Sequence, residues 1–217
     1  VHLLNEGFQV IRIGDNAMPK LRIRHRDYVE LPFVRDYHNE LDPFLISRSR
    51  FMIGCQSGPC AYARALGVPL LSINAVLHYT LLPAQMEMAC YKRYHRVPKQ
   101  ARNPRGRKVK ERAISLNQAL KAGVSHFENS HQFEQAAVAV KDARPEEILA
   151  AVKDMIAWIA DPGLPLTGEQ MAFAQQVEEM TQKLAASEST LDLPLADYLG
   201  IDLQGYRLSP TVARMRR

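Results

Sequence analysis

Short apolar runs alternate with helix-like stretches along the first half of this chain. The runs have the length of β-strands and occupy residues 9–13, 28–33, 51–55 and 70–74. Residues 39–49 and 61–66 fall between them, and both have the composition of helices. This alternation is typical of a doubly wound parallel sheet, so we predict an α/β fold with residues 51–55 as its central strand.

The second half of the chain is richer in helices. Residues 145–159 form the clearest amphipathic pattern, and residues 167–186 begin with Thr167 and Gln170 at the spacing of a capping box. Shorter elements are expected at residues 115–122 (a helix with Ser115 as its cap) and 138–140 (a strand). We therefore predict an α/β domain over residues 1–165, followed by a helix and a tail over residues 166–217. The tail is expected to pack loosely or against a missing domain.

The turn after residues 51–55 has the chemistry of an anion site. Its sequence is Gln56-Ser57-Gly58-Pro59. Gly58 would let a ligand approach the backbone, and Pro59 suits the first turn of a helix. The N–H groups at the start of such a helix favour a negative charge, most often a phosphate. Gln56 to Pro59 are therefore predicted to contact a phosphate group.

The chain resembles a family of GT-B glycosyltransferases found in bacterial surface-polysaccharide clusters. The resemblance begins with the Ser57-Gly58-Pro59 turn and a small-residue helix that ends in Leu66-Gly67-Val68-Pro69. It continues over roughly residues 1–175, at residues 7–15, Asp36-Tyr37, residues 40–45, Pro98-Lys99, residues 114–116 and residues 144–155.

The resemblance implies both a fold and an activity. The fold would be one Rossmann-like half of a GT-B enzyme, the donor-binding half, with a helical C-terminal extension. The activity would be transfer of a sugar from a nucleotide-diphosphate sugar to a glycan or lipid-linked acceptor, without a metal or other cofactor. The chain opens without Met in a helix-like stretch, and we expect an N-terminal domain before it. A cytoplasmic location is expected, with or without peripheral contact at the inner face of the membrane.

Further polar residues are assigned to the predicted donor site. Arg12 closes the first strand and could grip a diphosphate, while Asn74 closes the strand after the anion turn and could bind a sugar or ribose hydroxyl. Lys92, Arg93 and Lys99 would neutralise the departing diphosphate. Each assignment has a plainer alternative: an ion pair for Arg12, turn chemistry for Asn74, and a solvated charged surface for the lysines and arginine.

Asp36 is the candidate base that activates the acceptor hydroxyl. The alternative is that the base belongs to the domain expected before Val1. We therefore predict Asp36 and Lys99 as catalytic, and Arg12, Gln56, Ser57, Gly58, Pro59, Asn74, Lys92 and Arg93 as donor-binding.

Charge and cysteine content limit the other possibilities. The formal net charge is +5, and ten Lys and Arg side chains fall within residues 92–112, which the Pro and Gly content predicts to be an exposed loop. Three cysteines, without metal-ligand spacing, indicate free thiols in a reducing compartment. No Asp-x-Asp motif, P-loop or Gly-x-Gly-x-x-Gly pattern points to a metal, ATP or NAD.

Two alternatives to the transferase stay open. One is a nucleotide-sugar epimerase or hydrolase of the same fold, since fold alone does not separate these activities. The other is a basic module without catalysis that binds a polyanion through residues 92–112. Only Tyr91 and Tyr94 interleave the basic positions, so we expect no nucleic-acid partner.

Overall fold

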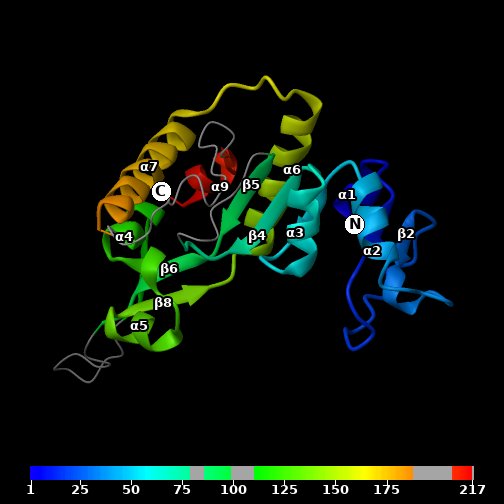
Figure 1. Cartoon of the computed structure of the whole chain (residues 1–217), viewed down its shortest axis with the longest axis horizontal. Coiled ribbons are helices and arrows are strands. Elements are labelled where there is room, and N and C mark those ends of the chain that lie inside the picture. The colour runs from blue at the N-terminus through cyan, green and yellow to red at the C-terminus, as the bar shows by residue number, and fades with distance from the viewer. Residues whose placement is uncertain (79–85, 99–109, 188–206, 217) are drawn as a thin grey trace. The chain divides into compact units, whose positions relative to one another are not determined.

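The computed structural model describes residues 1–78, 86–98, 110–187 and 207–216 (Figure 1). The chain divides into two compact units, Val1–Ser49 and Arg50–Arg217. The predicted boundary at residue 165 does not coincide with this division. The second unit continues past residue 165 because Phe173 and Leu208 pack in its core with side chains of the two sheets.

The first unit is built from small elements, namely α1 (His2–Asn5), β1 (Val10–Arg12), β2 (Tyr28–Glu30), the 3-10 helix η1 (Leu31–Phe33) and α2 (Leu41–Arg48). Both predicted strands are present but short, and they pair with each other in parallel. Pro32 ends the second strand, because it lies in the first turn of η1.

A four-stranded parallel sheet organises the second unit. Its order is β3 (Met52–Gly54), β4 (Leu70–Ala75), β5 (Glu87–Tyr91) and β9 (Arg207–Leu208). This confirms the predicted α/β class with a parallel sheet flanked by helices. However, β3 is an edge strand and only partly buried, whereas every residue of β5 is buried. The prediction of a central strand at residues 51–55 was wrong, because an apolar run indicates burial but not position across a sheet.

The C-terminal residues 207–216 are not a loose tail. They supply β9, which pairs with β5, and α9 (Pro210–Met215). Leu208 and Val212 are buried, and the Gln170 side chain donates a hydrogen bond to the Leu208 carbonyl at 2.7 Å. A two-residue strand carries no periodicity that sequence reasoning could detect. Residues 188–206, the rest of the predicted tail, lie outside the described residues.

A second sheet is antiparallel, and its first strand begins two residues after the end of β5. β6 (Arg93–Arg96) lies between β7 (Arg112–Ile114) and β8 (Val138–Lys141). The predicted exposed loop over residues 92–112 is therefore wrong at its two ends, while residues 99–109 lie outside the described part of the chain. The burial of Tyr94 accounts for a strand within this basic segment. Tyr94 is buried between the less buried Arg93 and His95, and its hydroxyl accepts a hydrogen bond from the Leu77 N–H at 2.8 Å.

Helices pack around both sheets (Figure 1). They are α3 (Gly58–Ala65), α4 (Leu116–Lys121), the 3-10 helix η3 (Val124–His126), α5 (Ser130–Gln135), α6 (Pro145–Ala160) and α7 (Gly168–Ser187). The cap predicted at Ser115 is confirmed and forms a capping box with Gln118. The capping box predicted at Thr167 and Gln170 is also confirmed. Figure 1 shows α6 passing behind β4 and β5.

The buried stripe of α6 differs slightly from the predicted one. The predicted apolar face consists of Ile148, Val152, Met155, Ile156 and Ile159. Val152 and Met155 are buried and the three isoleucines are partly buried, while Glu147, Ala151 and Trp158 complete the buried stripe. A buried glutamate in the first turn was not anticipated, because a charged residue there is ordinarily exposed at a helix N-terminus.

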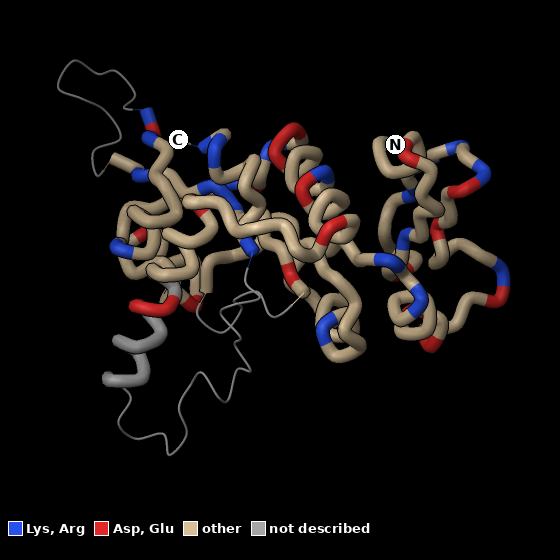
Figure 2. The backbone as a smooth tube through the Cα atoms, turned by 90° about the horizontal axis from the view of Figure 1, so that it is seen from above, with Lys and Arg blue, Asp and Glu red and all other residues tan. Residues whose placement is uncertain are grey.

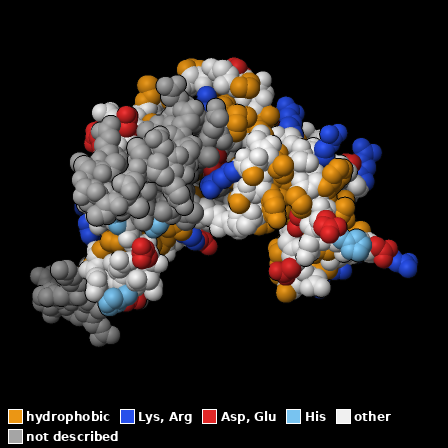
Figure 3. Space-filling model, viewed as in Figure 1, with side chains coloured by type: hydrophobic (Ala, Val, Ile, Leu, Met, Phe, Trp, Pro, Cys, Tyr) orange, Lys and Arg blue, Asp and Glu red, His pale blue; other side chains and the backbone are white. Residues whose placement is uncertain are grey.

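The surface mixes charge types and leaves some apolar side chains exposed. In Figure 2, basic and acidic positions are interspersed along the described backbone. Figure 3 shows hydrophobic side chains among polar ones on the displayed face, and the most exposed large ones include Phe44 of α2 and Tyr62 of α3.

Met155 provides a direct test of the α6 packing. Its side chain is fully buried, so we predict that Met155→Asp lowers the free energy of unfolding by about 4 kcal/mol or more, since the change removes apolar contacts and buries an unpaired charge. Leu149→Asp is the matched control, because Leu149 lies on the same helix with 39% of its surface exposed. Urea denaturation should separate the two variants, and equal stabilities would contradict this packing.

Candidate functional site at the carboxyl edge of the parallel sheet

The turn between β3 and α3 holds the residues predicted to contact a phosphate. Ser57 is the N-cap of α3, and within the described residues its side chain makes no capping hydrogen bond. Its hydroxyl lies 3.8 Å from the Cys60 sulfur, a weak contact. A Cβ added at Gly58 would meet no described atom within 4 Å. Space beside the Gly58 backbone is therefore open, whereas Pro59 has no N–H and the Cys60 N–H already bonds the Ser57 carbonyl at 3.0 Å.

Gln56 fixes the turn to the end of the neighbouring strand. Its side-chain amide accepts a hydrogen bond from the Val76 N–H at 2.7 Å and donates one to the Val76 carbonyl at 3.3 Å. Val76 directly follows β4. The sequence prediction placed Gln56 among the donor-binding residues, whereas these two contacts give it a positioning role.

Helix α3 is held by a buried ion pair that sequence reasoning missed. Glu87 of β5 is 1% exposed and receives two hydrogen bonds from the Arg64 guanidinium, at 2.8 and 3.0 Å. The Ser72 hydroxyl adds a third at 2.5 Å. Such a two-point grip fixes the helix in orientation as well as position. The sequence gives no signal for it, since these residues come from three different elements.

Cys60 is buried beneath the same turn. Its thiol donates a hydrogen bond to the Cys55 carbonyl at 2.7 Å, and burial raises the pKa of the Cys60 thiol. A Cβ at Gly54 would come within 2.6 Å of this sulfur, so the strand needs glycine there. All three cysteines are free thiols, and Cys55 is the exposed one.

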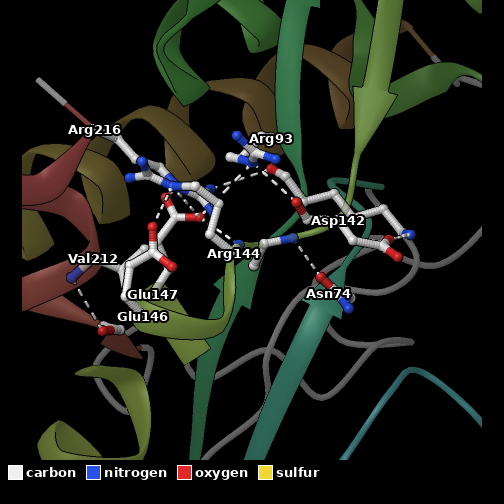
Figure 4. A network of polar contacts seen from close by, with 11 residues as sticks. Asn74, Arg93, Asp142, Arg144, Glu146, Glu147, Val212 and Arg216 are labelled. Atoms are coloured by element: carbon white, nitrogen blue, oxygen red, sulfur yellow. Dashed lines mark hydrogen bonds and ion pairs between the residues drawn. The ribbon is translucent and has the colours of Figure 1, made fainter. Parts of the chain in front are cut away.

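A network of charged groups lies where β4 and β5 end (Figure 4). At its centre, the fully buried Glu147 carboxylate accepts a hydrogen bond of 2.6 Å from Arg216 and one of 2.7 Å from the Arg144 N–H. The Arg93 guanidinium lies 3.8 Å from the same carboxylate. Arg216 also donates to the Lys92 carbonyl at 3.2 Å. The network therefore joins α6, β6 and the C-terminal residues.

Lys92 and Arg93, predicted to face a diphosphate, take part in this network. The Lys92 ammonium forms an ion pair with Asp142, and Arg93 donates to the Asp142 carbonyl at 2.9 Å. Their positive charge is thus partly neutralised by protein groups. Lys99, the third predicted member, lies outside the described residues.

Asn74 is held by the same region of the chain. Its side-chain oxygen accepts a hydrogen bond from the Ala143 N–H at 2.7 Å (Figure 4), and its φ of 51° is left-handed. It sits where the pairing of β4 with β5 shifts register. Asparagine adopts this conformation more readily than most residues. The turn-chemistry alternative therefore accounts for Asn74 without a ligand.

The remaining predicted residues belong to the first unit. The Arg12 guanidinium forms an ion pair of 2.8 Å with Glu30. This is the plainer alternative raised for Arg12, although the partners expected from the sequence were Asp15 or Asp27. Asp36 has a φ of 62°, and its side chain is 83% exposed beside Arg35. Nothing in the geometry of the first unit alone marks Asp36 as a base.

A cavity of about 990 Å³ opens at this edge of the second unit and was not anticipated from the sequence. Val76 and Lys92, which follow β4 and β5, form part of its wall. The rest comes from Val97 and Pro98, from α5 and the residues just before it, and from β8. Nearby, burial lowers the pKa of His78, an effect that the Glu128 carboxylate opposes. The cavity and the β3–α3 turn are linked through the hydrogen bonds between Gln56 and Val76.

Comparison with known proteins yields no relatives, since no protein-family model, curated protein or solved structure matches this chain. Among the described residues, no three His, Cys, Asp or Glu side chains group so as to hold a metal ion. The described helices also include none with the length and apolar character needed to cross a membrane.

The Glu147 network predicts a pH-dependent contribution to stability. Burial alone would raise the pKa of Glu147, but the Arg216 hydrogen bond and the Arg144 contacts outweigh it, and the pKa lies below the usual 4.5. A carboxyl group with a lowered pKa stabilises the fold above its unfolded pKa, and this stabilisation is lost as pH falls through its folded pKa.

Glu147→Gln should therefore lower the free energy of unfolding at pH 7 by about 3 kcal/mol, because Arg216 loses its buried partner. The difference in the free energy of unfolding between Glu147→Gln and the parent chain should become smaller once pH falls below about 4. Glu146→Gln is the control, with a side chain 55% exposed. Denaturant titrations across this pH range check the prediction, and a difference that stays constant with pH would contradict it.

Proposed function

We propose that the second unit binds the diphosphate of a nucleotide-sugar at the β3–α3 turn, and that the protein is a glycosyltransferase. The observation that carries the proposal is the uncapped start of α3 beside Gly58, at the carboxyl edge of a parallel sheet. In open α/β sheets, ligands bind beyond this edge, and phosphates favour helix N-termini there. The sequence resemblance supports the same position for the donor.

The contacts around the turn suit a preorganised site. Gln56 fixes the turn to the end of β4, and the Arg64–Glu87 pair fixes α3 to β5. Neither group has to move when a phosphate binds, so little binding energy is lost to ordering. In this proposal the Gly58 backbone and the Ser57 hydroxyl contact the phosphate, while Gln56 and Arg64 act by positioning them.

Charge stabilisation of the leaving group would come from α3 and from Lys92. Lys92 directly follows β5, and its ammonium is paired with Asp142. Exchange of that partner for a diphosphate would direct positive charge to the group that gains negative charge during transfer. Arg93 is held against the Asp142 carbonyl and lies near buried Glu147, which gives it a structural part.

Gly58→Val tests the phosphate contact. A Cβ at Gly58 faces open space, so the variant should fold, while the added methyl groups block approach of a ligand to the backbone. We expect affinity for UDP or GDP, measured by calorimetry, to fall by about tenfold or more. Gly168→Val is the matched control, because position 168 also faces open space, at the start of α7. Unchanged nucleotide affinity in Gly58→Val would refute the assignment.

Incubation with nucleotide-sugars separates transfer from the alternatives. A transferase needs an acceptor before it turns over at a useful rate, whereas an epimerase or hydrolase consumes the donor alone. Product analysis by mass spectrometry with and without acceptor distinguishes them. Rapid consumption of donor in the absence of acceptor would contradict the transferase and favour the related activities.

A further inference from the structure

The cavity beside the anion turn combines an aromatic wall with a polar rim. Phe127 and Phe133 contribute rings that meet edge to face, with centroids 5.0 Å apart. Val97 and Val138 extend the apolar surface. Both rings are only partly buried, so each keeps surface available to a ligand.

The rim comes largely from α5 and the residues just before it. Ser130, Phe133 and Glu134 are spaced three and four residues apart and so lie on one face of the helix, and all three line the cavity. Glu128 and Gln135 also line it. The cavity thus brings hydroxyl, carboxylate and amide groups to one side of an apolar floor, the arrangement of a specific small-molecule site.

The charge of the rim argues against an anionic occupant. Among the described lining residues, Glu128 and Glu134 bring two carboxylates, and the ammonium of Lys92 is paired with Asp142. A diphosphate placed beside Glu128 and Glu134 would meet repulsion, in contrast to the start of α3. The cavity and the turn therefore favour ligands of opposite electrostatic character.

We propose that this cavity binds a neutral or amino-substituted oligosaccharide, and, resting on the proposed function, that this saccharide is the acceptor. One face of a pyranose ring carries only C–H groups and packs on aromatic rings, while its hydroxyl edge donates strong hydrogen bonds to carboxylates. A volume of about 990 Å³ exceeds a single sugar ring and accommodates a short oligosaccharide. Gln56, bonded to Val76 in the cavity wall, links the acceptor site to the donor turn.

The experiment uses the full chain and three probes: maltotriose, chitotriose and the de-acetylated trimer of glucosamine. Saturation-transfer NMR and calorimetry should detect binding of at least one of them in the absence of nucleotide. Phe133→Leu keeps an apolar, somewhat smaller side chain but removes the ring, and it should weaken this binding by about fivefold. Phe44→Leu is the matched control, because Phe44 is 60% exposed on α2 and does not line the cavity.

The outcomes separate this proposal from the transferase proposal. UDP affinity should be the same in Phe133→Leu as in the parent chain, since the diphosphate is assigned to the turn. Failure of all three saccharides to bind, or equal saccharide affinity in Phe133→Leu and Phe44→Leu, would overturn the cavity assignment. So would a loss of UDP affinity in Phe133→Leu, which would place the nucleobase in the cavity. Saccharide binding without any nucleotide binding would instead uphold the cavity and refute the donor site.

Discussion

The second unit depends on one buried carboxylate. Glu147 lies in the first turn of α6 without exposed surface, and three arginines surround it. They come from β6, from the residue before α6, and from Arg216 at the end of the described chain. Burying a lone carboxylate is costly, so these arginines must be in place together. The carboxylate thereby sets how the helix, the antiparallel sheet and the C-terminal residues meet at the carboxyl edge of the parallel sheet.

The groups that could bind a ligand lie at the same edge of the parallel sheet. The β3–α3 turn offers an uncapped helix start, and the cavity offers aromatic and carboxylate groups a short way along the edge. Two rigid links hold the turn, one from Gln56 to Val76 and one from Arg64 to Glu87. Parallel sheets make such arrangements common, because every strand delivers its following loop to one side. A donor and an acceptor brought to a single edge would need only a short path between them.

The pairing of charges shows why residue type alone is a weak guide to a binding site. Lys92 and Arg93 were assigned to a diphosphate because they are basic and follow a strand, but both have protein partners at Asp142. Asn74 was assigned to a hydroxyl, and its side chain instead bonds the Ala143 N–H at a left-handed backbone position. Each contact spans some fifty residues or more of sequence, a separation over which local patterns carry no information.

The sequence by itself determined the local elements. Apolar runs located β3 and β4, the Ser-Gly-Pro turn located the start of α3, and capping residues located α4 and α7, because these features depend on neighbours within one or two turns. Only the tertiary structure decided that β3 lies at an edge, that residues 207–208 complete the sheet, and that a cavity opens beside α5. Those outcomes arise from strand pairing and from the burial of Glu147. In both cases the interacting residues are far apart in the sequence, so their pairing depends on the complete fold.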